Sequence, residues 1–108
     1  MKPLFAALAA TAGLLFVQGA QAVDAKAAAA LAQSSGCMTC HDIGQKKIGP
    51  AFKAVAAKYH GDKNAESWLI KKVTQGGSGV WGNVPMPPNA QVSEADIKTL
   101  VEWILSLK

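Results

Sequence analysis

Apolar residues recur at intervals of three and four along three stretches of this chain, which is the spacing of one helix face. The stretches are residues 52–59, 64–75 and 93–106, and the last has the most regular pattern. Its apolar face consists of Ile97, Leu100, Val101, Ile104 and Leu105, and its polar face of Lys98, Thr99, Glu102 and Ser106. No alternation of apolar and polar residues is long enough to indicate a β-sheet. The pattern predicts an all-α fold.

Local signals at helix ends add a fourth helix over residues 24–35, which are rich in alanine. Asp24 is placed to cap its first turn, and Gly36 to end it. The start signals expected for the other three helices are Pro50, Asn64, and Ser93 with Asp96. The sequence therefore predicts about four short helices joined by loops.

The longest predicted loop covers residues 76–92 and contains four glycines and three prolines. This composition excludes a regular element, and a loop of such length in a small domain is uncommon unless it has a function. Met86 lies between Pro85 and Pro87, which stiffen the backbone on both sides. The loop is therefore suited to presenting the Met86 side chain in a fixed position.

Residues 1–22 have the pattern of a cleaved secretory signal peptide. Lys2 precedes an apolar run from about residue 4 to residue 17, and Ala20-Gln21-Ala22 matches the small-x-small cleavage pattern. An uncleaved membrane anchor is the alternative, but the apolar core is short for a span. We expect cleavage after Ala22, leaving residues 23–108 as one exported domain without a membrane span.

The charge of the expected mature chain is modest. Removal of Lys2 lowers the formal net charge from +4 to +3, and the chain contains no arginine. Nucleic-acid-binding proteins commonly use arginine for contacts to phosphate and guanine, so that class is disfavoured. A domain this small buries little surface and often depends on a metal, a disulfide or a cofactor.

Cys37, Cys40 and His41 form a Cys-x-x-Cys-His sequence, which is the attachment motif of c-type haem. The two sulfurs form thioethers to the vinyl groups, and the adjacent histidine then places a ring nitrogen toward iron. A zinc site needs about four ligands, and here only His60 remains as a candidate fourth. A thioredoxin-like centre needs a βαβ context, and a disulfide across so short a loop would constrain the unfolded chain little. We therefore predict one covalently bound haem c with His41 as the first axial ligand of its iron.

The second axial ligand has three candidates. Met38 lies between the two anchoring cysteines and cannot reach around the ring. His60 lies beside Gly61 at a predicted helix end, where a solvated histidine is the simpler interpretation. Met86 lies in the stiff Pro-rich loop, and a thioether ligand raises the haem potential relative to a second histidine. Met86 is the predicted ligand, with core packing as the alternative.

The order and spacing of several motifs resemble the short bacterial class I cytochromes c, in particular the cytochrome c-551 type. The resemblance covers nearly the whole mature chain. The motifs are Cys37 to His41, Ile48-Gly49-Pro50, Gly79-Val80-Trp81-Gly82, Pro85-Met86-Pro87-Pro88-Asn89 and Glu102-Trp103-Ile104-Leu105. The resemblance implies the small single-domain cytochrome c fold, in which short helices surround one haem.

The resemblance also implies roles for residues around the haem. Cys37 and Cys40 would be the thioether anchors, with His41 and Met86 as axial ligands. The Pro50 carbonyl would accept a hydrogen bond from the His41 ring, Asn89 would bond near the Met86 sulfur, and the Trp81 indole would reach a haem propionate. Lys72 stands where the family often has an arginine near the propionates, and lysine lacks the planar fork of that residue.

The function implied is that of a soluble periplasmic monohaem carrier of single electrons, a monomer without enzymatic activity. Its donor would be a membrane quinol-oxidising complex, and its acceptor a nitrite reductase, a peroxidase or an oxidase. Seven lysines lie between residues 46 and 72. They form either a docking surface for an acidic partner or ordinary solvated helix faces. A haem sensor or peroxidase-like protein with a displaced Met86, and a zinc-stabilised interaction module, remain alternative interpretations.

Overall fold

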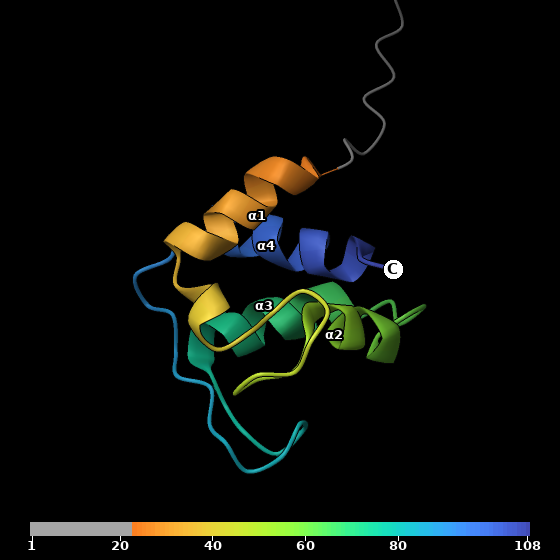
Figure 1. Ribbon diagram of the computed structural model, residues 1–108, viewed down its shortest axis with the longest axis vertical. Helices are drawn as coiled ribbons and strands as arrows, with labels where there is room; N and C mark the ends of the chain where they lie inside the picture. The colour runs from red at the N-terminus through yellow and green to blue at the C-terminus, as the bar shows by residue number, and fades with distance from the viewer. Residues whose placement is uncertain (1–22) are drawn as a thin grey trace, which may run out of the picture.

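The computed structural model describes residues 23–108, which form four α-helices and one short 3-10 helix (Figure 1). The elements are α1 (Ala25–Ser34), η1 (Cys37–Thr39), α2 (Phe52–Lys58), α3 (Ala65–Gln75) and α4 (Glu94–Ser106). Over these residues the β-pairing consists of a single antiparallel bridge between Gly77 and Met86. The all-α prediction is confirmed. The predicted signal peptide, residues 1–22, lies outside the described residues.

The predicted caps at the starts of α1 and α4 are confirmed. The Asp24 carboxylate accepts hydrogen bonds from the backbone N–H groups of Lys26 and Ala27, at 3.0 and 3.2 Å. The Ser93 hydroxyl accepts the N–H of Asp96 at 3.2 Å at the start of α4. Both side chains satisfy donors that the first turn of a helix leaves unpaired.

Of the other two predicted starts, the one at Pro50 is wrong and the one at Asn64 is right in position only. Helix α2 begins at Phe52 with Ala51 as its cap, so Pro50 lies before the helix and is not its first residue. Asn64 precedes α3, but its side chain forms no capping hydrogen bond. The Asp62 carboxylate accepts the Asn64 N–H at 2.8 Å, a local turn just before the helix.

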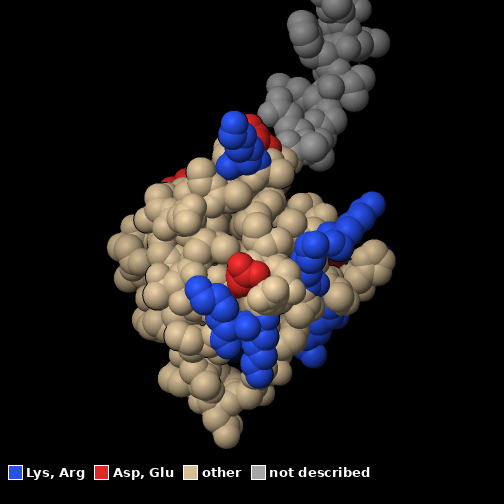
Figure 2. Space-filling view, in the orientation of Figure 1, with Lys and Arg blue, Asp and Glu red and all other residues tan. Residues whose placement is uncertain are grey.

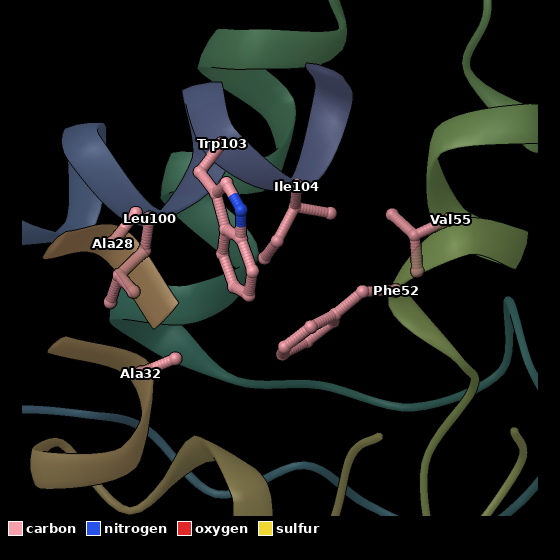
Figure 3. Packing of buried hydrophobic residues seen from close by; sticks show 7 residues of the cluster. All are labelled: Ala28, Ala32, Phe52, Val55, Leu100, Trp103 and Ile104. Carbon is pink, nitrogen blue, oxygen red and sulfur yellow. The ribbon is translucent and has the colours of Figure 1, made fainter. Parts of the chain in front are cut away.

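The core forms around α4, which packs against α1, α2 and α3. The indole of Trp103 on α4 is buried and meets the Phe52 ring edge to face, with ring centroids 5.6 Å apart. Figure 3 shows Trp103 between Phe52 and the α1 residues Ala28 and Ala32, which have no exposed surface. Small alanines allow α1 to approach a helix that carries a large indole, since close packing requires complementary volumes.

An exposed ion-pair cluster also links α3 to α4. The Lys98 ammonium lies 2.5 Å from the Glu102 carboxylate and 3.7 Å from that of Glu66 on α3. The hydrogen bond from Lys98 lowers the pKa of Glu102, and the same contact raises the pKa of Lys98. Solvent screens such pairs, so the cluster adds little to the stability that α4 gains from burial.

The two long connections, residues 35–51 and 76–92, lie in the lower part of the view in Figure 1, away from the start of α1. They contain every predicted site residue except Lys72, which lies in α3. Of residues 23–108, no helix combines the length and the apolar character needed to cross a membrane.

Candidate haem site

A cavity of about 430 Å³ lies between the two long connections and the helices α2, α3 and α4. This volume is within the range of pockets that hold small molecules and cofactors, about 300–1,000 Å³. Most of its lining is apolar, including Phe52, Val55, Leu100 and Ile104. Among the predicted site residues, all except Asn89 line it: Cys37, Cys40, His41, Pro50, Lys72, Trp81 and Met86.

The cysteine motif is held in a short turn at the end of α1. Gly36 adopts a positive φ of 82°, and the Cys37 carbonyl then accepts the N–H groups of Cys40 and His41, at 3.3 and 3.0 Å. The Lys47 ammonium donates to the Met38 carbonyl at 2.9 Å, which ties the turn to the next loop. Both cysteines are free and half-buried, and both line the cavity.

Burial raises the pKa of the Cys37 thiol above its ordinary value, and a backbone hydrogen bond opposes this only in part. Cysteines that act as redox nucleophiles have a lowered pKa, because cations or helix N-termini stabilise their thiolates. Cys37 has the opposite environment. Among residues 23–108 no three His, Cys, Asp or Glu side chains are grouped in a way that could hold a metal ion.

The His41 ring is fixed on three sides. Its Nδ1 lies 2.8 Å from the Pro50 carbonyl oxygen, which is the hydrogen bond that the resemblance implies. The ring stacks on Phe52, with centroids 4.9 Å apart and planes 23° from parallel. Gly49 lies against the ring so closely that a Cβ there would be 2.6 Å from its Cε1. A hydrogen bond at Nδ1 leaves Nε2 as the nitrogen available to a metal.

The Met86 backbone is tied to the end of α3. Its N–H donates to the Gly77 carbonyl at 2.8 Å, and its carbonyl accepts the Gly77 N–H at 3.0 Å. Gly76 next to this bridge has φ 71° and ψ −169°, a conformation that is essentially restricted to glycine. The loop is therefore less irregular at Met86 than its composition suggests, and the half-buried methionine side chain lines the cavity.

Asn89 lies against the end of α3. Its side-chain amide donates to the carbonyls of Val73, at 3.1 Å, and Pro87, at 3.5 Å. Its backbone N–H also donates to the Val73 carbonyl at 3.1 Å. That carbonyl belongs to the last turn of α3, where intrahelical partners run out. Asn89 thus anchors the loop of residues 76–92, which we call the methionine loop, to α3. These bonds are separate from the bridge between Gly77 and Met86.

Two lysine–tryptophan contacts lie at the edge of the cavity. The Lys58 ammonium is 5.6 Å from the Trp81 ring centroid, and the Lys72 ammonium is 5.1 Å from that of Trp68. Trp81 lines the cavity and is 44% exposed. Sequence patterns gave no indication of Trp68 as a site residue, because its contact depends on the way Lys72 folds back along α3.

The lining fits an iron porphyrin. The imidazole of His41 is held by its ring contacts, and the thioether of Met86 is held through its backbone. Imidazole and thioether are donors that haem iron accepts in proteins. Of the charged side chains, Lys46 and Lys72 line the cavity and no Asp or Glu does so over residues 23–108. That balance suits a flat apolar molecule carrying two carboxylates.

Comparison with known proteins agrees with this geometry. Residues 25–108 match the cytochrome c family. The chain is 60% identical over 77 residues to cytochrome c-551 of Allochromatium vinosum, covering 71% of this chain and 82% of the relative. It is 44% identical over 108 residues, the whole of both chains, to cytochrome c-551 of Pseudomonas aeruginosa. The crystal structure of wild-type Nitrosomonas europaea cytochrome c552 matches it with a TM-score of 0.72 and 50% identity, covering 74% of this chain and 99% of that one.

The helical fold and its apolar cavity beside a Cys-x-x-Cys-His turn define a protein of the c-type haem class. The chain belongs to the cytochrome c family, and to the class I proteins within it. It is a small monohaem electron carrier with one covalently bound haem c. The predictions of fold and cofactor, and the resemblance itself, are confirmed.

Proposed function

We propose that this cytochrome is exported to the periplasm and carries single electrons through a haem attached at Cys37 and Cys40 and ligated by His41 and Met86. The observation that carries the proposal is that His41 and Met86 line one cavity while each is fixed by a separate hydrogen-bonded contact. Bound haem supplies reversible one-electron chemistry at its iron. His41 and Met86 would both bind the iron and would leave no coordination site open to a substrate, so we infer a carrier and not an enzyme.

The chain's own residues have three tasks in this proposal. The Pro50 carbonyl accepts a hydrogen bond from the Nδ1–H of His41, which fixes the tautomer and makes Nε2 a stronger donor. The Gly77 bridge and the Asn89 anchor keep Met86 at a constant position relative to α3. The apolar lining excludes water from the cavity. A site held this firmly changes little between oxidation states, which favours rapid electron exchange.

The proposal is tested by spectroscopy of the exported protein. The red colour should survive acid–acetone extraction, and the mass should equal residues 23–108 plus one haem. The oxidised form should show a sulfur-to-iron charge-transfer band, and the reduced form should not bind CO rapidly. The Met86→Ala variant is the matched control: it should keep the covalent haem, lose the band and bind CO. A wild-type protein that binds CO readily and lacks the band would instead be a sensor or peroxidase-like protein.

Export is supported by the signal-like pattern of residues 1–22 and by the alignment of all 108 residues with the Pseudomonas aeruginosa relative. Attachment of haem c takes place on the outer side of the bacterial cytoplasmic membrane. Export and attachment are therefore consistent with each other. We propose a monomer without a membrane span after cleavage, working between a quinol-oxidising complex and a nitrite reductase, peroxidase or oxidase.

The lysines near the cavity support docking to an acidic partner. Lys46 and Lys72 line the cavity and Lys58 lies over Trp81 at its edge. Figure 2 shows basic side chains gathered over the lower and right-hand parts of one face. Electrostatic attraction accelerates such encounters, and salt screens it over about 8 Å at physiological ionic strength.

Electron transfer to an acidic redox partner is therefore expected to slow as the salt concentration rises. Stopped-flow measurement of the bimolecular rate at several ionic strengths checks this expectation. The control variant Lys26→Gln removes a positive charge from α1, outside the cavity lining. It should leave the salt dependence of the rate unchanged. A rate independent of salt would contradict docking through the lysines and leave the assignment as a carrier intact.

A further inference from the structure

Lys72 is held by an aromatic pair that the proposed function does not use. Its ammonium lies 5.1 Å from the centroid of the Trp68 ring, one turn earlier on α3. The Trp68 Nε1–H in turn donates to the Tyr59 hydroxyl at 3.2 Å, so the end of α2 fixes the orientation of the indole. The three side chains form a connected row from Tyr59 through Trp68 to Lys72.

This row ends at the cavity. The Lys72 ammonium lies against the backbone of Gly77, where a Cβ would come within 2.6 Å of Nζ. Lys72 is half-buried, whereas the preceding residue, Lys71, is exposed and does not line the cavity. Tyr59 lines the same cavity. The row therefore holds one ammonium at the wall of a cavity that contains no acidic side chain among the described residues.

The Lys72 side chain needs a contact such as that with Trp68 to hold its ammonium in one place. Its four-carbon side chain is flexible and its ammonium is a strongly hydrated point charge, so it lacks the preorganised fork of arginine. An aromatic face within about 6 Å attracts the ammonium and restricts the directions it can take. Trp68 is itself 41% exposed, so burial in the core does not account for a large indole at this place.

We propose that Trp68, oriented by Tyr59, is a positioning residue that holds the Lys72 ammonium on the cavity wall, where it pairs with a carboxylate of the haem. The inference rests on the proposed function in one respect, the presence of haem in this cavity. The new element is the contact with Trp68, which holds the lysine ammonium in place for that pairing. Trp68 acts through Lys72 and does not touch the cofactor.

The reduction potential and the lysine resonances test the proposal together. Lys72→Met should lower the potential, because loss of a nearby positive charge favours the oxidised iron, and it should do so more than the matched Lys71→Met. Trp68→Leu should lower the potential in the same direction, and the double variant should lower it no further than Lys72→Met alone, since the two residues act through one contact. Trp68→Phe, which keeps an aromatic face, should retain most of the wild-type potential.

An independent readout is the NMR shift of the Lys72 side chain. Ring current from Trp68 should move its ε-methylene protons upfield, and Trp68→Leu should abolish that displacement.

Two outcomes would overturn the inference. If Trp68→Leu reduces thermal stability but leaves the potential and the Lys72 resonances unchanged, Trp68 has a structural role only. If Lys72→Met shifts the potential no more than Lys71→Met, Lys72 pairs with no haem carboxylate. In either case an intact sulfur-to-iron band shows that the proposed ligation still holds. Absence of that band from the wild-type protein would count against the proposed function instead.

Discussion

Replacing Gly76 by alanine is expected to break the proposed Met86–iron bond in most molecules and to lower the free energy of unfolding by about 2–4 kcal/mol. Two costs combine. The backbone at Gly76 has φ 71° and ψ −169°, which side-chain-bearing residues rarely adopt. An alanine Cβ would also lie 2.9 Å from the Pro87 carbonyl carbon and Pro88 nitrogen, with the Met86 carbonyl oxygen nearer still.

These neighbours are backbone atoms, so they cannot rotate away as a flexible side chain would. Relief requires the methionine loop to move from α3, and the bridge between Gly77 and Met86 would open. The sulfur-to-iron band and CO binding by the reduced protein report the loss of the ligand. Chemical denaturation reports the loss of stability.

Gly61→Ala is the matched control for this variant. Gly61 has a similar φ of 76°, but an added Cβ there would meet no atom within 4 Å. It should cost about 1–2 kcal/mol for the left-handed backbone alone and leave the band intact. Equal stability and equal band intensity in the two variants would mean that the methionine loop tolerates the alanine without moving, contrary to the expectation.

Replacing Gly49 by alanine is expected to displace the His41 ring from the Pro50 carbonyl. The new Cβ would lie 2.6, 2.9 and 3.1 Å from the ring atoms Cε1, Nδ1 and Nε2. The ring cannot yield easily, because it stacks on Phe52, and the Gly49 N–H is bonded to the Cys40 carbonyl at 2.8 Å. Outer partners of a metal-bound histidine contribute about 10–100-fold in metal affinity, or about 1.4–2.8 kcal/mol.

The expected result is that the low-spin haem spectrum of the Gly49 variant is lost at a lower denaturant concentration. The His41 Nδ1 proton should also exchange faster with solvent, which NMR measures directly. Gly44→Ala in the same loop is the control, since a Cβ there meets nothing within 4 Å, and it should change stability by no more than about 0.5 kcal/mol. Slow exchange of the Nδ1 proton in the Gly49 variant would show that the ring keeps its partner.

The contrast between Pro50 and Asn89 shows how far resemblance to a family reaches. The contact expected of Pro50 is present, because Pro50 lies nine residues after His41 in the same connection. For Asn89 the structure shows bonds to the Val73 and Pro87 carbonyls, and the bond expected near the Met86 sulfur stays a prediction. Its amide has several acceptors within reach, and the register of the loop against α3 selects among them.

The sequence by itself determined the helices and the attachment motif. Helix positions follow from apolar spacing of 3.6 residues and from caps such as Asp24 and Ser93, all of which are local in the chain. The cysteine motif confines its chemistry to five consecutive residues, from Cys37 to His41. Such features need no knowledge of distant segments.

Only the tertiary structure decided how distant segments meet at the cavity. The bridge between Gly77 and Met86, and the hydrogen bond between Trp68 and Tyr59, join residues of different segments whose separation in the chain does not set their separation in space. The contact between Trp68 and Lys72, by contrast, follows from their spacing of one turn on α3. The contacts between segments exist because α4 packs against α1, α2 and α3 and so fixes where the ends of α2 and α3 lie. Packing of the whole core sets these distances, and no local pattern of residues encodes them.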